Sequence, residues 1–213
     1  MKTLVLSTAL LLIVCSSIVG AQSDQPVFRE NMPSELLKEL NEKLTAFRIK
    51  YPLSSETEKC VSEAVASLKL VCPSLSIENE KKIQKAGPGA IRVIAELLTA
   101  QDKELRLRAL MALGIFMKIR EEITDEYTEY ENLLILLYRR SLFDMDVEMR
   151  NGAVWSLFGV GSQRFPKIPP SIINALKDAW INDPDTKVRD SADLALQDLG
   201  VIPRDPNREY IIN

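Results

Sequence analysis

Paired carboxylates are the residues of this sequence whose spacing could support acid–base chemistry. Asp144 and Asp146 are separated by a single residue, and so are Asp183 and Asp185. Two carboxylates held near each other can serve as general acid and general base. Because both pairs occupy the same position in a repeated sequence pattern, we expect them instead to cap helix N-termini, where backbone N–H groups need acceptors.

An acidic segment, residues 121–131, offers a second possible site, for a cation or for a basic partner. It lacks the alternating Asp or Asn residues and the central Gly of a calcium-binding loop. Its density of charge is typical of a solvated segment between helices, which is the structure we expect.

The chain of 213 residues contains no histidine, which excludes Ser-His-Asp catalysis, Cys-His catalysis and histidine-ligated metals. It also contains no Walker loop, no GxGxxG motif and no GxSxG motif. We therefore predict that the protein is not an enzyme and has no catalytic residues, no bound metal and no cofactor.

The balance of charge excludes another class of partner. The sequence has 27 Lys and Arg against 30 Asp and Glu, which gives a net charge of −3. A general electrostatic hold on nucleic acid needs an excess of basic residues, so we expect no nucleic-acid partner. The hydrophobic fraction of 46% suits one globular domain or a short repeat array with a core.

The N-terminal segment has the pattern of a secretory signal peptide. Lys2 precedes an uncharged run over residues 3–20, and a polar stretch begins at Gln22. The small residues Val19 and Ala21 stand at the −3 and −1 positions of a cleavage site between Ala21 and Gln22.

We therefore predict a signal peptide over residues 1–21 and a polar linker over residues 22–33. The protein would be secreted or periplasmic, with no membrane span after cleavage. Two alternatives stay open. The uncharged run 3–20 is near the lower length limit for a membrane span and could persist as an anchor, and Cys15 could carry a lipid.

Two cysteines, Cys60 and Cys72, follow the predicted cleavage site. Residues 55–71 have the pattern of one helix, in which 12 positions at about 1.5 Å each place the two cysteines about 18 Å apart. A disulfide needs Cα atoms within about 7 Å, so we predict no bridge between them unless this helix breaks. We expect Cys60 to be a small buried apolar residue.

A repeated pattern occupies the second half of the chain. Three segments share the frame Asp or Ala, x, Asp, x, x, apolar, Arg, x, x, Ala, and an amphipathic helix precedes each of them. The segments are residues 100–114, 144–158 and 183–197. Their arginines, Arg106, Arg150 and Arg189, are 44 and 39 residues apart. Helix pairs of this kind bury their apolar faces by stacking on one another.

These segments resemble the HEAT repeat, particularly its short bacterial-type variants. The family has two antiparallel helices with Asp at the turn and Arg in the second helix, as in Asp144 with Arg150 and Asp183 with Arg189. The resemblance implies an all-α fold, a right-handed α-solenoid of antiparallel helix pairs. It also implies a ladder of Asp–Arg hydrogen bonds between neighbouring repeats, from which Ala100 departs.

The coarse organisation follows from helix patterns and proline positions. We predict one domain over residues 34–213, with N-terminal helices at 34–49, 55–71 and 77–85, helix-pair repeats over 86–200 and a tail over 201–213. The helices that carry Arg106 and Arg150 are predicted to end near Glu122 and Val160. No segment alternates as a strand would, so we expect no sheet.

An apolar surface is the best candidate for a binding site. Second helices line the concave face in the HEAT family, and there the pattern places Leu107, Met111, Trp155 and Phe158. The segment 105–119 is apolar nearly all round, which indicates either a buried helix or a binding surface. Both interpretations stay open: neighbouring helices or a Pro-rich loop cover these residues, or they receive a partner peptide or helix.

The function we predict is that of a non-enzymatic, extracytoplasmic, HEAT-like scaffold that binds a protein or peptide on its inner helices. The alternative is a small-ligand or chromophore-handling protein of the lyase type, since some HEAT-like proteins act on bound cofactors.

Overall fold

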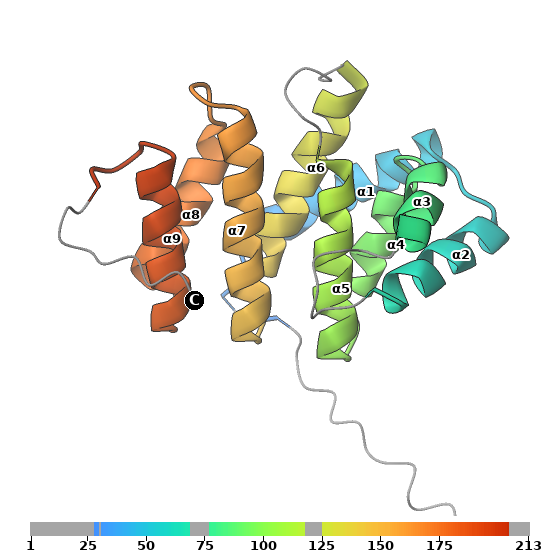
Figure 1. The fold of residues 1–213 in the computed structure, drawn as a ribbon, viewed down its shortest axis with the longest axis horizontal. Coiled ribbons are helices and arrows are strands. Elements are labelled where there is room, and N and C mark those ends of the chain that lie inside the picture. The colour runs from blue at the N-terminus through green and yellow to red at the C-terminus, as the bar shows by residue number, and fades with distance from the viewer. Residues whose placement is uncertain (1–27, 30, 69–76, 118–124, 205–213) are drawn as a thin grey trace, which may run out of the picture.

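The structure is a computed structural model that describes residues 28, 29, 31–68, 77–117 and 125–204 (Figure 1). Within these residues the chain forms nine α-helices and one short 3-10 helix, without a β-strand. The elements are α1 (Ser34–Lys50), α2 (Ser55–Ala66), α3 (Ile77–Lys85), α4 (Ala90–Leu97), α5 (Lys103–Leu113), η1 (Gly114–Phe116), α6 (Asp125–Ser141), α7 (Val147–Gln163), α8 (Pro170–Asn182) and α9 (Thr186–Asp198). The predicted all-α class is confirmed.

Several predicted features lie outside the described residues. They are the signal peptide at 1–21 with Cys15, most of the linker at 22–33, Cys72, and the tail from residue 205. Among the helices that the structure describes, none combines the length and the apolar character needed to cross a membrane.

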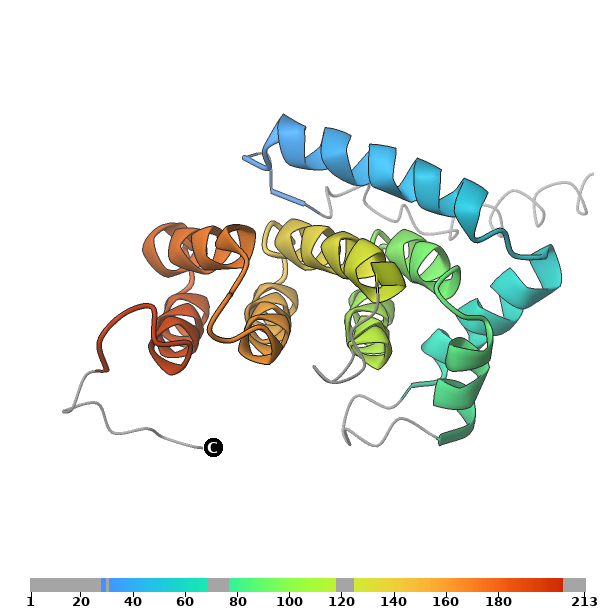
Figure 2. The ribbon, with the colours of Figure 1, turned by 90° about the horizontal axis from the view of Figure 1, so that it is seen from above.

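The helices of the second half lie in two rows (Figure 2). One row holds α4, α6 and α8, and the other holds α5, α7 and α9. The helix α1 lies across the outer side of the first row, where it packs on α6 and α4. The helices α2 and α3 close one end, with α2 packed on both α4 and α5.

The core lies mainly between the two rows and beneath α1. All residues of the segment Leu133–Tyr138 in α6 are buried, because α1, α7 and α8 pack around this helix. Each fully buried leucine-sized side chain stabilises the fold by roughly 1.5–3 kcal/mol. The central position of α6 therefore explains why this segment is apolar on every side of the helix.

Small residues allow the helices of the second row to approach their neighbours. Ala109, Ala153 and Ala192, which occupy the same position in the three repeated frames, are completely buried. A Cβ at Gly152 would lie 2.8 Å from Cδ2 of Leu110, so any larger residue there would displace the Leu110 side chain between α7 and α5.

The helix that carries Arg106 is shorter than the sequence predicts. It ends at Leu113 instead of near Glu122, and the chain tightens into η1 at Gly114, whose carbonyl accepts a hydrogen bond of 3.1 Å from the N–H of Met117. Glycine lowers helix propensity, and Met117 is already extended. Glu122 lies outside the described residues. The helix that carries Arg150 continues past Val160, to Gln163.

The acidic segment also differs from its prediction. Its second half, from Asp125, belongs to α6 and not to a solvated connection between helices. Glu131 is buried and forms an ion pair with Arg164, which follows α7. The apolar run Leu133–Tyr138 lies in the core, and Glu131 just before it is buried as well.

Cys60 is exposed, which contradicts the prediction that it is buried. The helix α2 turns Val61, Ala64 and Val65 toward the core, and this places Cys60 on the solvent side. The same helix ends at Ala66, so the continuous helix predicted to Val71 is wrong within the described residues.

Candidate functional site

Two buried arginines connect successive helix pairs. Arg106 in α5 donates from Nε to Oδ2 of Asp144 at 2.9 Å and from Nη2 to Oδ1 at 3.1 Å. Arg150 in α7 makes the same pair with Asp183, at 2.8 and 3.1 Å. All four side chains are buried. Two parallel hydrogen bonds to one carboxylate fix both the distance and the orientation of the neighbouring helix pairs.

The third nitrogen of each guanidinium, Nη1, binds backbone carbonyls in the turn that precedes the arginine's own helix. Nη1 of Arg106 donates to the carbonyls of Ala100 and Gln101, six and five residues earlier, and Nη1 of Arg150 and Arg189 donates to the equivalent carbonyls. Residue 100 contributes only its carbonyl to this contact. Alanine therefore suffices at the first turn, although it offers no carboxylate to an arginine on its N-terminal side.

Arg189 is the last of the three arginines and contacts no carboxylate in the described part of the chain. Its Nη2 donates instead to Oγ1 of Thr186 at 3.0 Å. Of the predicted ladder residues, the structure thus joins Arg106 with Asp144 and Arg150 with Asp183. Arg189 touches Asp183 only through the backbone carbonyl.

The paired aspartates divide two tasks between them. Asp146 and Asp185 accept from backbone N–H groups of α7 and α9, as N-caps do. Asp144 and Asp183 accept from the N–H of the residue two positions later and from an arginine. Each of the four carboxylates thus accepts at least one hydrogen bond from within the protein, in a capping or an interhelical role.

The two carboxylates of the α6–α7 turn have opposite pKa shifts. Burial raises the pKa of Asp144, although Asp146 N–H and Arg106 partly oppose it. Burial alone would also raise the pKa of Asp146, but hydrogen bonds from Lys103 and from the N–H groups of Met149 and Glu148 together lower it. The cap therefore favours a charged Asp146.

The four residues of the predicted binding surface lie on α5 and α7, which pack against each other. Leu107, Met111 and Phe158 are half-buried, and Trp155 is 38% exposed. The Trp155 and Phe158 rings meet edge to face, with centroids 5.7 Å apart. The structure therefore brings the two aromatic residues together and leaves Trp155 partly open to solvent.

Met117 lies beside Gly114 of η1 and Gly159 of α7, a contact that the sequence analysis did not predict. A Cβ at Gly114 or Gly159 would lie within 3.7 Å of the Met117 side chain. Its flexible thioether thus fills the space between the ends of η1 and α7. The glycines opposite a methionine are the sequence signal that could have indicated this contact.

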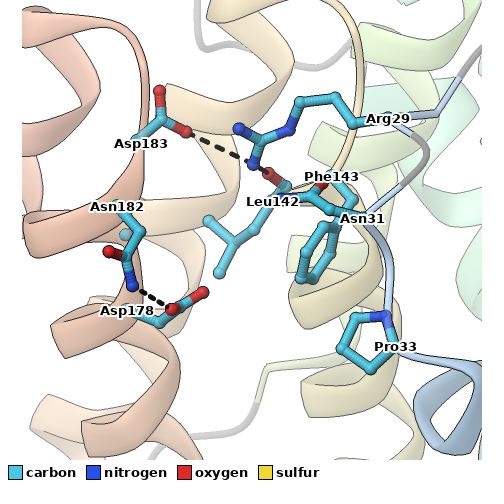
Figure 3. Close-up of a pocket in the computed structure, with 9 residues that line it drawn as sticks. Arg29, Asn31, Pro33, Leu142, Phe143, Asp178, Asn182 and Asp183 are labelled. Carbon is cyan, nitrogen blue, oxygen red and sulfur yellow. Dashed lines mark hydrogen bonds and ion pairs between the residues drawn. The ribbon is translucent and has the colours of Figure 1, made fainter.

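A second surface was missed entirely. Residues 28 and 29, inside the predicted linker, lie against the α6–α7 turn, and Figure 3 shows Arg29 there. The N–H of Arg29 donates to the carbonyl of Phe143 at 2.7 Å, and its Nη2 donates to the carbonyl of Leu142 at 2.8 Å. Nη2 also lies 3.6 Å from Oδ2 of Asp183. A lone arginine in a polar segment carries no pattern that predicts this contact.

A polar pocket of about 260 Å³ lies beside Arg29 (Figure 3). Asn31 and Phe143 line one side, and Asp178, Asn182 and Asp183 line the side formed by α8. Nδ2 of Asn182 donates to Asp178 at 2.7 Å, so one wall is already hydrogen-bonded.

The described residues contain no group of three or more acidic, cysteine or histidine side chains arranged to hold a metal ion. No protein-family model, no curated protein and no solved structure matches the chain.

Proposed function

We propose that this chain is a HEAT-like, right-handed α-solenoid of antiparallel helix pairs and that it serves as a protein-interaction scaffold. Three observations support the architecture: the repeated frames open α5, α7 and α9, the helices lie in two rows, and successive pairs are joined by the Arg106–Asp144 and Arg150–Asp183 contacts. In such arrays each unit contacts mainly its neighbours.

The partner surface is the apolar face of α5 and α7 around Leu107, Met111, Trp155 and Phe158. The observation that carries this proposal is the partial exposure of Trp155, which is 38% accessible while its ring edge meets Phe158. Partly exposed aromatic residues with a rigid support are typical anchors of protein interfaces. The occupant would be a protein segment with an apolar side chain that covers the indole.

The scaffold would work outside the cytoplasm. The charge pattern and the small residues before Gln22 support export of the chain. Retention through residues 3–20 and a lipid on Cys15 are the alternatives, and each would leave the same helical domain attached to a membrane.

A small-ligand or chromophore-handling protein is the second candidate, and the pocket at Arg29 is the observation in its favour. Its volume of about 260 Å³ is below the range of roughly 300–1,000 Å³ typical of ligand pockets. Its lining is polar, with Arg29, Asp178 and Asn182, whereas most cofactor sites are largely apolar. The scaffold is therefore the function we favour.

Partner capture with matched tryptophan variants tests the proposal. Trp180 in α8 is 37% exposed and lies in the other row, so Trp180→Ser is the control for Trp155→Ser/Phe158→Ser. In-cell crosslinking followed by mass spectrometry should identify a partner that wild type and Trp180→Ser share and the double variant loses. A partner retained by the double variant would contradict the surface. A small molecule that co-purifies, with no protein captured, would favour the second candidate.

A further inference from the structure

We infer that the edge formed by the α6–α7 and α8–α9 turns is a recognition site for an extended peptide that carries an aromatic residue followed by arginine. In the structure the chain's own Phe28 and Arg29 occupy this site. The edge is distinct from the apolar face of α5 and α7, so the inference does not depend on the proposed scaffold function.

Backbone contacts attach this segment to the α6–α7 turn through one isolated β-bridge. Phe28 forms an antiparallel bridge with Asp144, and the N–H of Arg29 donates to the carbonyl of Phe143 at 2.7 Å. Hydrogen bonds of this kind do not distinguish one extended sequence from another. Selectivity at the edge must therefore come from the two side chains.

The arginine position is defined by three separate contacts (Figure 3). Nη2 of Arg29 donates to the carbonyl of Leu142 at 2.8 Å and lies 3.6 Å from Oδ2 of Asp183, and Cζ is 5.6 Å from the Phe143 ring centroid. Asp183 also binds Arg150. A planar guanidinium can contact a carbonyl, a carboxylate and an aromatic ring at the same time. The ammonium group of lysine matches this arrangement less well.

The aromatic position is defined by Arg140, in the last turn of α6. The Cζ atom of Arg140 is 4.4 Å from the centroid of the Phe28 ring, within the range of a cation–π contact. The Nε atom of Arg140 is buried and has no acceptor in the described part of the chain. When Phe28 leaves the edge, the Arg140 guanidinium loses its aromatic partner. An aromatic residue of the incoming peptide would restore this contact.

Phe28 and Arg29 fill the edge incompletely, which favours their replacement by a peptide from another molecule. Phe28 and Arg29 are only half-buried, and the buried Nε of Arg29 also has no acceptor among the described residues. Burial lowers the pKa of Arg29, because the nearby Asp183 only partly offsets the loss of water. The pocket next to it leaves Asp178 and Asn182 within reach of a polar side chain that follows the arginine.

A labelled peptide with the sequence of residues 24–33 tests the inference by fluorescence anisotropy. Its receptors are the full chain and the full chain with Phe28→Ala/Arg29→Ala, which removes both side-chain contacts of the chain's own segment and so weakens its hold on the edge. We expect saturable binding to the variant and at least about tenfold weaker binding to wild type, since self-occupancy lowers the fraction of competent receptor. A control peptide with alanine at the positions of Phe28 and Arg29 should not bind either receptor.

Two outcomes would overturn the inference: no saturable binding to a variant whose circular dichroism matches wild type, or equal binding of the control peptide. If the double variant does not fold, Arg29→Ala alone supplies a receptor whose arginine position is vacant, while the Phe28–Arg140 contact stays in place. Trp155→Ser in the receptor should leave peptide binding unchanged, which separates this edge from the proposed scaffold surface.

Discussion

The guanidinium of Arg150 and the carboxylate of Asp183 form a doubly hydrogen-bonded ion pair, at 2.8 and 3.1 Å, between α7 and the turn before α9. Both side chains are buried, so removal of the Asp183 carboxylate would leave the Arg150 guanidinium buried without its ionic partner. Such a pair adds little net stability over an apolar replacement, yet its disruption from one side is costly. Its role is therefore to fix the position of the last helix pair.

Asp183→Ala should lower the free energy of unfolding by about 3–5 kcal/mol, because it leaves Arg150 buried without its carboxylate. Asp185→Ala is the matched control in the same turn, where only the cap of α9 is lost, and should cost about 1 kcal/mol. Urea denaturation followed by circular dichroism measures both. Equal losses for the two variants would contradict the role given to Asp183.

Arg189→Ala should cost much less than Arg150→Ala. Arg189 is half-buried and binds two carbonyls and a hydroxyl, with no carboxylate among the described residues. We expect a loss of about 1 kcal/mol, typical of a neutral hydrogen-bonding role, against about 3–5 kcal/mol for Arg150→Ala. The same denaturation experiment compares them, and a larger loss for Arg189→Ala would show that the array does not end at this residue.

The repeated frame made much of the fold predictable. Helix periodicity correctly indicated an all-helical chain, α3 has the predicted bounds of 77–85, and α1 differs by a single residue at its end. The alanine of each frame is completely buried, since a small residue at fixed helical spacing has a direct packing consequence. Local pattern and tertiary packing agree at these positions.

The sequence could not show contacts that depend on distant parts of the chain. Arg29 lies 113 positions before Leu142, to which it donates, and a non-repetitive segment gives no pattern for such a pairing. The exposure of Cys60 depends on which face of α2 meets α4 and α5. The early end of α5 at Leu113 contradicts an apolar pattern that continues to residue 119, because apolar periodicity does not mark helix ends.

The stability difference between wild type and Asp146→Asn should depend on pH. The folded-state pKa of Asp146 lies below its ordinary value of 3.8. A carboxylate with a lowered folded pKa contributes stability that is present above the unfolded pKa and is lost as the pH falls through the folded value. Wild type should therefore be more stable than Asp146→Asn at pH 6, and the two should converge below pH 3.8.

Lys103 provides the control for this pH dependence, because its ammonium lies 3.1 Å from Oδ2 of Asp146. Lys103→Met should reduce the difference at pH 6 without removing it, since the backbone donors of Glu148 and Met149 remain. Thermal denaturation across the pH range measures both variants. A difference between wild type and Asp146→Asn that grows as the pH falls would contradict the lowered pKa.

The proposed export of the chain has a direct readout in its N-terminus. Expression in a host with an active secretion pathway should give a mature protein that begins at Gln22, since Ala21 and Val19 have the small side chains that signal peptidases accept. N-terminal sequencing and intact mass measure this. Retention of residues 1–21 in a membrane fraction would favour the anchor, and a lipid-sized mass increase on Cys15 would favour the lipoprotein alternative.

Trp155 and Trp180 separate binding from stability, because their exposed fractions are nearly the same, 38% and 37%, while they lie in different rows. Trp155→Ser and Trp180→Ser should therefore lower the melting temperature by similar amounts, and only Trp155→Ser should reduce partner capture. Leu157→Ala sets the scale for a core position, since Leu157 is completely buried and its truncation should cost about 2–5 kcal/mol. A loss for Trp155→Ser that approaches the Leu157→Ala value would make Trp155 a core residue. If partner capture by Trp155→Ser, Trp180→Ser and Leu157→Ala fell in proportion to their loss of stability, the loss of capture would reflect unfolding. The α5–α7 face would then have no binding role.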